Sequence, residues 1–171
     1  MFSKDDVQSW YIFYTYPRSE KKAFISLESA GYEVYIPLIE SRRIWKNRQI
    51  KLITEPLFPN YIFVRITQER IFCVLENSKI VNYISCGTSP SKLNSEDIDH
   101  ISKLLKVGDD ISIDPEMQTG QFVKVIKGPL KGYEGVLTTK KGGARFGIEI
   151  KGLPYTISVE INSNCTRIMY P

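Results

Sequence analysis

EPLFPNYIFV, the stretch Glu55–Val64, decides the fold of the first part of this chain. Its two prolines force an extended entry into a strand, because each proline fixes its own φ and restrains the residue before it. Successive side chains of a strand point to opposite faces, so Ile62 and Val64 share one face. Tyr61 and Phe63 then share the other face. We therefore expect a strand that presents aromatic rings on one side.

The surrounding sequence predicts further strands and helices that pack with this one. A second aromatic strand is expected over Trp10–Tyr14, where Trp10, Ile12 and Tyr14 alternate with Tyr11 and Phe13. The other expected elements are a helix capped by Ser19 and ended by Gly31, strands over 32–37 and 80–85, a short helix over 68–76, and a helix capped by Asn94 or Ser95. Residues 1–106 therefore predict an α+β fold, an antiparallel or mixed sheet flanked by helices.

The last third of the chain has a different pattern. Short strands joined by glycine-rich turns are expected over residues 122–127, 135–139, 146–150, 155–161 and 166–170. Between the two parts, residues 107–118 interrupt both apolar periodicities, and we interpret them as a linker. Residues 119–171 therefore predict a small all-β barrel of the SH3-like type, joined to the first domain by that linker.

Composition excludes several classes of protein. The chain has 171 residues, 42% hydrophobic and 25% charged, with a net charge of +4, which is typical of a soluble globular protein. Its longest apolar stretch is far shorter than the roughly 20 residues of a membrane span. The acidic start, Lys4-Asp5-Asp6, does not resemble a secretory leader, so we expect a cytoplasmic monomer with no membrane partner.

The residues that catalytic and metal sites need are scarce. The chain has one histidine, His100, and three widely separated cysteines, Cys73, Cys86 and Cys165, which we expect to be buried and reduced. No nucleotide-binding loop or nucleophile-base pair is present. We therefore expect a protein that is not an enzyme and that has no cofactor and no metal.

Two segments carry a resemblance to a known family. Trp10-Tyr11 together with Glu55–Val64 is similar to the N-terminal (NGN) domain of the NusG family of transcription elongation factors. The proline-bracketed form resembles its specialised antiterminator branch, typified by RfaH and the UpxY proteins of polysaccharide operons. The second segment resembles the KOW motif of the same family and contains Gly128, Pro129, Gly132 and Gly135. The resemblance covers nearly the whole chain and implies an NGN domain followed by a KOW barrel.

The two aromatic strands allow two interpretations. Either both faces of the sheet are core, or Tyr14, Tyr61 and Phe63 line an exposed apolar hollow that receives a partner helix. The resemblance favours the second, because these positions match family residues that grip the clamp helices in the largest subunit of RNA polymerase. Phe58 is a further candidate for this contact.

Two basic clusters are candidates for nucleic-acid binding. Residues 41–54 contain no acid and are expected to form either a projecting hairpin or a solvated loop, and the matching insertion in the family lies near upstream DNA. The second cluster surrounds the start of the first helix, where the specialised branch reads the non-template strand. Tyr16-Pro17 replaces a basic pair used by RfaH, so the same base readout is not expected. The candidate residues are Arg18, Lys21, Lys22, Arg42, Arg43, Lys46, Arg48 and Lys79.

The KOW unit is expected to bind a second partner. Phe122, Ile126 and Leu153 are the candidate contacts, and the resemblance implies the NusE ribosomal protein or the termination factor Rho. The motif glycines are expected to make turns and not a phosphate cradle.

The function that the resemblance implies is suppression of pausing or termination, at specific operons such as those for polysaccharides. The alternatives are a general NusG-type elongation factor and a ribosome-associated RNA-binding KOW protein.

Overall fold

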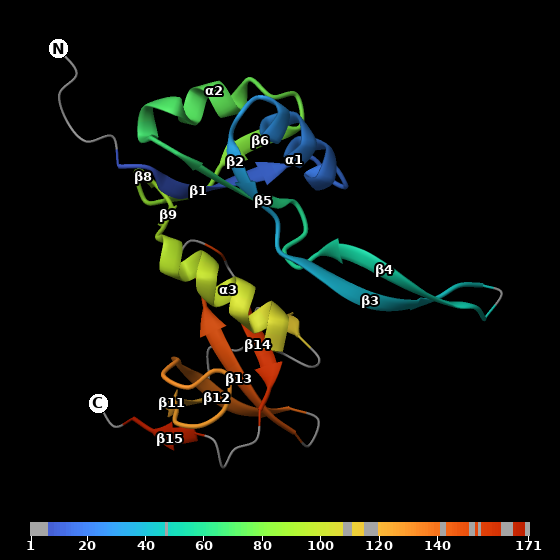
Figure 1. Ribbon diagram of the computed structural model, residues 1–171, viewed down its shortest axis with the longest axis vertical. Coiled ribbons are helices and arrows are strands. Elements are labelled where there is room, and N and C mark those ends of the chain that lie inside the picture. The colour runs from blue at the N-terminus through green and yellow to red at the C-terminus, as the bar shows by residue number, and fades with distance from the viewer. Residues whose placement is uncertain are drawn as a thin grey trace. The chain divides into compact units, whose positions relative to one another are not determined.

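The chain divides into two compact units, residues 1–98 and residues 99–171, and each is described by itself (Figure 1). The computed structural model describes residues 7–46, 48–107, 111–114, 120–140, 143–150, 153, 155–161 and 166–169. Within these residues no helix is both long and apolar enough to cross a bilayer.

An antiparallel sheet forms the centre of the first unit. Its strand order is β2-β5-β1-β6, and β9 pairs with the start of β1 beside β6. The strands are β1 (Ser9–Thr15), β2 (Glu33–Tyr35), β5 (Tyr61–Ile66), β6 (Ile80–Tyr83) and β9 (Lys92–Leu93), and β7 (Ser85–Cys86) pairs separately with β8 (Ser89–Pro90). The two aromatic strands predicted from sequence are thus β1 and β5, side by side at the middle of the sheet.

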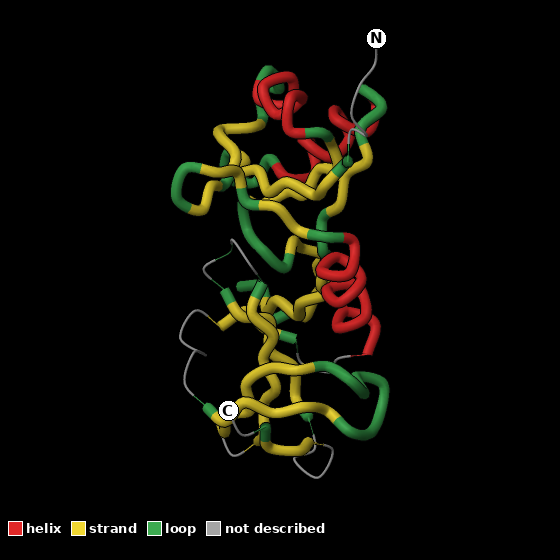
Figure 2. The backbone as a smooth tube through the Cα atoms, turned by 90° about the vertical axis from the view of Figure 1, so that its left-hand side faces the viewer, coloured by secondary structure: helices red, strands yellow, loops and turns green. Residues whose placement is uncertain are grey.

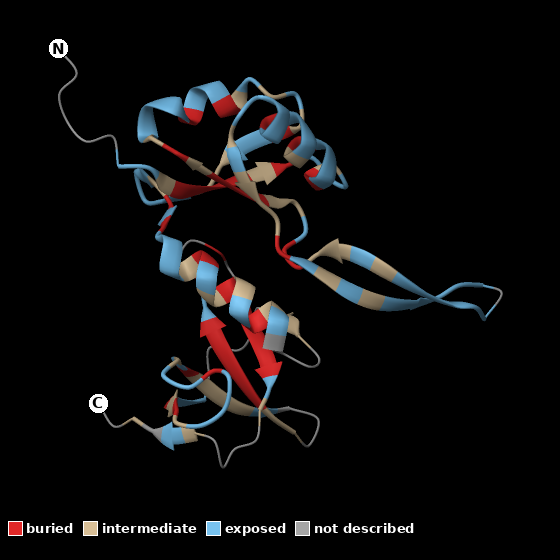
Figure 3. Cartoon of the chain, in the orientation of Figure 1, coloured by how far each residue is buried: buried red, intermediate tan, exposed pale blue. Residues whose placement is uncertain are grey.

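Two helices cover one face of this sheet (Figures 1 and 3). They are α1 (Glu20–Ser29) and α2 (Ile71–Leu75), the latter preceded by a turn of 3-10 helix over Gln68–Arg70. Ala23 and Leu27 lie one helical turn apart and are buried, as the sequence pattern predicts. Buried side chains of the core on this face are Tyr11, Phe13, Ala23, Leu27, Ile62, Val64, Ile66, Ile71, Val74 and Ile80.

A buried carboxylate joins the start of α1 to the start of β5. Glu20 is buried, and its Oε1 accepts a hydrogen bond of 2.7 Å from the backbone N–H of Asn60. Asn60 has φ +68°, a left-handed conformation that asparagine tolerates better than most residues. Its carbonyl oxygen in turn accepts a hydrogen bond of 2.8 Å from the N–H of Thr15. These bonds fix the turn that leads into Tyr61.

Replacing Glu20 with alanine is expected to lower the free energy of unfolding by about 1–3 kcal/mol, because the N–H of Asn60 would lose its partner. Urea unfolding followed by circular dichroism measures the change. Glu28→Ala is the matched control, since Glu28 is exposed on the same helix and should change stability by less than about 0.5 kcal/mol. Equal stability of the two variants would contradict the anchoring role of Glu20.

A long hairpin lies between β2 and β5. Its strands are β3 (Leu38–Ile44) and β4 (Ile50–Pro56), paired in continuous register from Leu38 with Pro56 to Ile44 with Ile50. Figure 1 shows it extending away from the sheet of its own unit. Of the two expectations for residues 41–54, the projecting hairpin is therefore confirmed.

The second unit is mostly strand (Figure 2). One antiparallel sheet has the order β10-β14-β13-β12-β11-β15. Its strands are β10 (Ser112–Asp114), β11 (Gln121–Val125), β12 (Glu134–Lys140), β13 (Gly143–Glu149), β14 (Thr156–Glu160) and β15 (Thr166–Ile168). The expected strands are all present. Ser112–Asp114, predicted as linker, instead forms an edge strand, because it finds backbone partners along β14.

Helix α3 (Ser95–Val107) begins at the predicted cap. The Asn94 side chain accepts a hydrogen bond from the Asp97 N–H, and the Asp97 carboxylate accepts one from the Asn94 N–H. The boundary between the units follows Ile98, so the rest of the helix belongs with the strands of the second unit. The His100 ring lies 4.5 Å from the ring of Tyr133 there. The sequence-based boundary after residue 106 remains a prediction.

The KOW glycines serve backbone geometry. Gly128 and Gly132 have φ of +86° and +94°, and the Gly132 N–H donates to the Val125 carbonyl oxygen at 2.8 Å, which closes a tight loop. A Cβ at Gly135 would collide with the backbone of Gly147 on the neighbouring strand. Pro129 is exposed in the same loop. Gly128 and Gly132 therefore agree with the prediction of turns, whereas the prediction is wrong for Gly135, which lies within strand β12.

One prediction about the cysteines is wrong. Cys73 on α2 and Cys86 on β7 are free thiols, but both are exposed and not buried. On α2 the buried positions are taken by Ile71 and Val74, which leaves Cys73 on the solvent side, and on β7 both residues are exposed. Cys165 lies outside the described residues. Among the described residues, no group of acidic, histidine and cysteine side chains could hold a metal ion.

Candidate functional site: an aromatic sheet face and a basic hairpin

The sheet face turned away from α1 and α2 carries a row of aromatic side chains. In the antiparallel register of β1 and β5, Ile12 pairs with Phe63 and Tyr14 pairs with Tyr61. Paired residues of adjacent strands point to the same face, so the predicted set of Tyr14, Tyr61 and Phe63 does share one face. The opposite face holds the helix-covered core.

Ring contacts connect this row from one strand to the next. The centroids of Tyr14 and Tyr61 are 5.4 Å apart with an interplanar angle of 77°, an edge-to-face arrangement. Phe63 lies 6.2 Å from Tyr35 on β2 and 6.1 Å from Phe58. Sequence reasoning missed Tyr35 as a member of this row, although its alternation with Val34 within the predicted strand could have placed it there.

Burial divides the four predicted contact residues into two pairs. Phe58 and Phe63 are both 0% exposed, so the prediction of an exposed hollow is wrong for these two rings. The reason lies in the loop before β5, where the Leu57 N–H donates to the Pro37 carbonyl oxygen at 2.8 Å and holds Phe58 over Phe63. Tyr14 and Tyr61 are half-buried and reach the surface. The accessible part of the aromatic row is therefore the tyrosine pair.

The hairpin carries the strongest positive charge of the first unit. Arg42, Lys46 and Arg48 are exposed, and none of them forms an ion pair with any residue that the structure describes. Arg43 differs, because its guanidinium lies 2.8 Å from the Glu55 carboxylate on the opposite strand. The Ser41 hydroxyl and the Arg43 guanidinium hold the pKa of Glu55 below its ordinary value. Arg43 is thus partly neutralised, while the other three charges are open to an anion.

The predicted cluster around α1 is only partly available. Arg18 is exposed in a turn with φ +60°, and Lys22 is exposed on the first turn of α1. Lys21 is engaged, since its Nζ donates a hydrogen bond of 2.7 Å to the Thr54 carbonyl oxygen of β4. Lys79 is half-buried, and its carbonyl oxygen accepts from the N–H of Tyr16 at 3.1 Å, which brings its segment beside the turn of Arg18.

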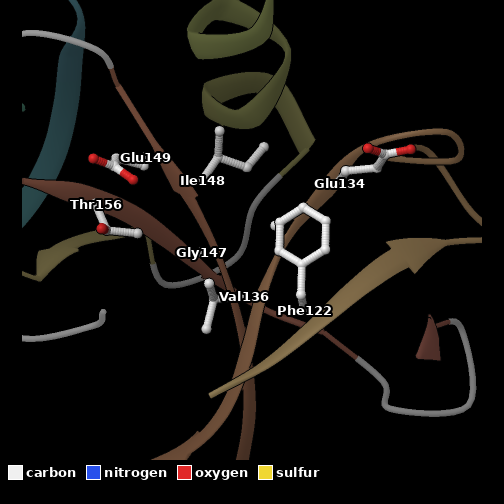
Figure 4. A pocket seen from close by; sticks show the side chains of 8 residues that line it. Phe122, Glu134, Val136, Gly147, Ile148, Glu149 and Thr156 are labelled. Atoms are coloured by element: carbon white, nitrogen blue, oxygen red, sulfur yellow. The ribbon is translucent and has the colours of Figure 1, made fainter. Parts of the chain in front are cut away.

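The second unit has a hollow on its sheet, seen in Figure 4. Phe122, one of the predicted contacts, is 50% exposed at its edge, and Glu134, Val136, Ile148, Glu149 and Thr156 also line it. Ile126 is half-buried. Leu153 is buried, so its prediction as a surface contact is wrong; its N–H donates to the Ile150 carbonyl oxygen, which holds it next to the end of β13.

Comparison with known proteins finds similarity to one family. The sequence model of a family described as transcription termination factor nusG matches residues 8–102, more than half of the chain. The chain is 23% identical over 144 residues to the transcription termination/antitermination protein NusG of Halalkalibacterium halodurans, an alignment that covers 76% of this chain and 80% of the relative. It is 27% identical over 142 residues to the NusG of Bacillus subtilis, and this alignment covers 75% of this chain and 79% of the relative.

Longer alignments include the second unit. The NusG of Lactococcus lactis is 24% identical over 176 residues, with 94% of this chain and 88% of the relative covered. The fold is similar to that of a solved structure described as domain interaction in Thermotoga maritima NusG. The TM-score is 0.56 and the sequence identity is 19%. That alignment covers 96% of this chain and 98% of the other, so the fold is shared along the whole length.

Proposed function

The chain belongs to the NusG family of transcription termination and antitermination factors, and from that premise we propose that it binds transcribing RNA polymerase through Tyr14 and Tyr61. As a member of this family it is a transcription factor and not an enzyme. The proposed contact on the polymerase is the pair of clamp helices in its largest subunit. The first domain would bind this protruding coiled coil.

The observation that carries this proposal is the half-buried tyrosine pair next to fully buried aromatic rings on the same face of the sheet. Tyr14 and Tyr61 are half-buried and lie edge to face, and the Tyr14 hydroxyl accepts a hydrogen bond of 3.5 Å from the Asn60 side chain, while Phe63 and Phe58 are closed to water. Tyrosines supply large apolar contact area with few rotatable bonds, which makes them frequent centres of binding energy. Phe58 and Phe63 therefore support the contact and do not touch the partner.

The proposed mechanism is a shift of population between polymerase states. Pausing and termination involve loosening of the clamp, so a protein that binds the closed clamp more tightly favours elongation. The shift cannot exceed the difference in binding free energy for the two states. A difference of about 1.4 kcal/mol already changes the ratio of the two states about tenfold. No chemistry is required of the bound factor.

Operon specificity is a further part of the proposal. Its support is the proline-bracketed segment before β5, which resembles the specialised branch of the family, together with the long basic hairpin that precedes it. In this view the protein suppresses pausing only where a particular DNA element exposes its recognition sequence. A general factor would act equally on every template.

The second unit is proposed to recruit another protein. Phe122 at the edge of the hollow in Figure 4 offers an apolar anchor, and Ile126 follows the same strand. By family resemblance the partner is the NusE ribosomal protein or Rho. Tethering it to polymerase through this chain raises its effective concentration near the transcript.

Nucleic-acid binding by the hairpin gives a separate prediction. Replacing Arg42, Lys46 and Arg48 together with glutamine is expected to weaken duplex DNA binding and to lower the salt slope by up to about three, since each neutralised phosphate contributes roughly 0.9. Fluorescence anisotropy across a salt series measures this. The matched control removes three exposed lysines of the second unit, Lys103, Lys127 and Lys131. Equal slopes for the two triple variants would contradict the hairpin assignment.

A transcription assay tests the proposed function itself. Purified RNA polymerase is halted and restarted on templates with and without candidate leader sequences, and pause lifetimes are measured with and without the protein. The proposal expects shorter pauses when the protein is present, limited to templates that carry the leader. Unchanged lifetimes on every template would contradict it.

A further inference from the structure

The β3–β4 hairpin holds an exposed tryptophan next to the end of β3. Trp45 is 53% exposed, and Ile44 beside it is 74% exposed. The Trp45 N–H donates to the Gln49 carbonyl oxygen at 2.9 Å, and the Arg48 N–H donates to the Trp45 carbonyl oxygen at 2.8 Å. Arg48 has φ +61°, which completes this tight turn. Both backbone polar groups of Trp45 are therefore hydrogen-bonded within the hairpin.

The surroundings of the ring are cationic and apolar at once. The Lys51 ammonium lies 4.9 Å from the ring centroid, a cation–π contact. The indole also lines a shallow hollow together with Arg43, Ile44, Lys46 and Ile53. A flat apolar wall bordered by cations matches the chemistry of a nucleobase next to its phosphates.

Charge selects the class of ligand for this hollow. Residues 41–54 hold five basic side chains and no acid, so an anionic partner is favoured. Beyond Trp45 the described residues Lys46, Arg48 and Gln49 are exposed and polar, whereas a segment that inserts into a lipid bilayer would need apolar residues there. A polyanion with apolar flat groups fits both observations, and a nucleic acid with unpaired bases is such a molecule.

We propose that Trp45 is a stacking platform for an unpaired base, so that the hairpin binds single-stranded nucleic acid in preference to duplex. Lys46 and Arg48 would contact the adjoining phosphates. Base pairs in a duplex hide their faces from a side chain, while every base of a single strand has a free face, and the platform is sequence-tolerant for that reason. This inference rests on the proposed contact of the hairpin with nucleic acid and gives that contact its preferred ligand.

Tryptophan fluorescence of the full chain tests the inference directly. The chain has two tryptophans, and Trp10 is buried, so the difference between the wild type and Trp45→Phe reports on Trp45. Titration with a short oligothymidylate is expected to quench the emission of Trp45. A blunt duplex of equal phosphate content should bind with less quenching. Equal quenching by both, or none by the single strand, would overturn the inference.

Substitution gives an independent readout of the same step. Trp45→Ala is expected to weaken oligothymidylate binding about tenfold, while Trp45→Phe retains most of the affinity because phenylalanine also stacks. Leu52→Ala is the control, since Leu52 is an exposed apolar residue of the same hairpin that does not line the hollow. If Trp45→Ala and Leu52→Ala weaken binding equally, the stacking role is wrong.

Two outcomes separate this inference from the proposed function. If the wild-type protein binds duplex in a salt-dependent manner through the hairpin but shows no preference for oligothymidylate, the stacking platform is overturned and the hairpin contact stays in place. Vesicles of equimolar phosphatidylcholine and phosphatidylglycerol form a further arm. A blue shift of Trp45 emission with these vesicles, and no response to oligothymidylate, would overturn the inference in favour of a lipid surface.

Discussion

Replacing Tyr14 and Tyr61 together with alanine is expected to weaken binding to core RNA polymerase by at least about 100-fold while the protein remains folded. Each ring is half-buried and lies at the surface of the sheet, so its removal leaves no large internal cavity. Central tyrosines of an interface commonly contribute about 2 kcal/mol or more each, and two of them account for the predicted loss. Co-purification with tagged polymerase, followed by titration, measures the effect.

The control for this double variant is Tyr16→Ala. Tyr16 is an exposed tyrosine immediately after β1 and lies outside the paired strands, so its loss should leave polymerase binding unchanged when nucleic acid is absent. Circular dichroism establishes that both variants are folded. Wild-type yield of polymerase with the double variant would contradict the assignment of the sheet face.

Replacing Phe63 with alanine is expected to have a different and larger effect on the fold. Its ring is fully buried against Tyr35 and Phe58, and removing such a ring costs about 3–5 kcal/mol through lost apolar contact and a residual cavity. That is a large share of the roughly 5–15 kcal/mol that stabilises a typical domain. Urea unfolding monitored by circular dichroism measures the loss.

Tyr61→Ala is the matched comparison, two residues away on the same face of β5. It should lower the free energy of unfolding less than Phe63→Ala, because Tyr61 is only half-buried whereas Phe63 is fully buried. A similar loss of stability in both variants would show that the two rings do not differ in burial as described. The difference also means that a polymerase-binding defect in a Phe63 variant reports on folding and not on a lost contact with polymerase.

The sequence alone predicts the local pattern of the aromatic strands but not their coverage. Alternation along β1 and β5 places Tyr14, Tyr61 and Phe63 on one face, and the register confirms it. The burial of Phe63 depends on Tyr35 from β2 and on the loop held by Pro37, contacts between residues far apart in the chain. Period-two patterning says which face a side chain points to and not what lies over that face.

The same limit explains the second unit and the hairpin. The cap and apolar face of α3 are readable from Asn94 and the spacing of Ile98 and Ile101, yet the unit with which the helix packs is not. The strand at Ser112–Asp114 was missed because three residues without alternation give no signal until β14 supplies their partners. The basic run of the hairpin was visible, whereas the neutralisation of Arg43 by Glu55 follows only from strand pairing.

Site-specific photocrosslinking from position 61 tests the central claim most directly. A photoreactive phenylalanine analogue replaces Tyr61 in the full chain, and a matched variant carries it at Ile25, an exposed position on α1. After irradiation with transcribing RNA polymerase, the account predicts a crosslink from position 61 to the clamp helices of the largest subunit and none from position 25. A crosslink from position 25 alone, or from neither position, would contradict it.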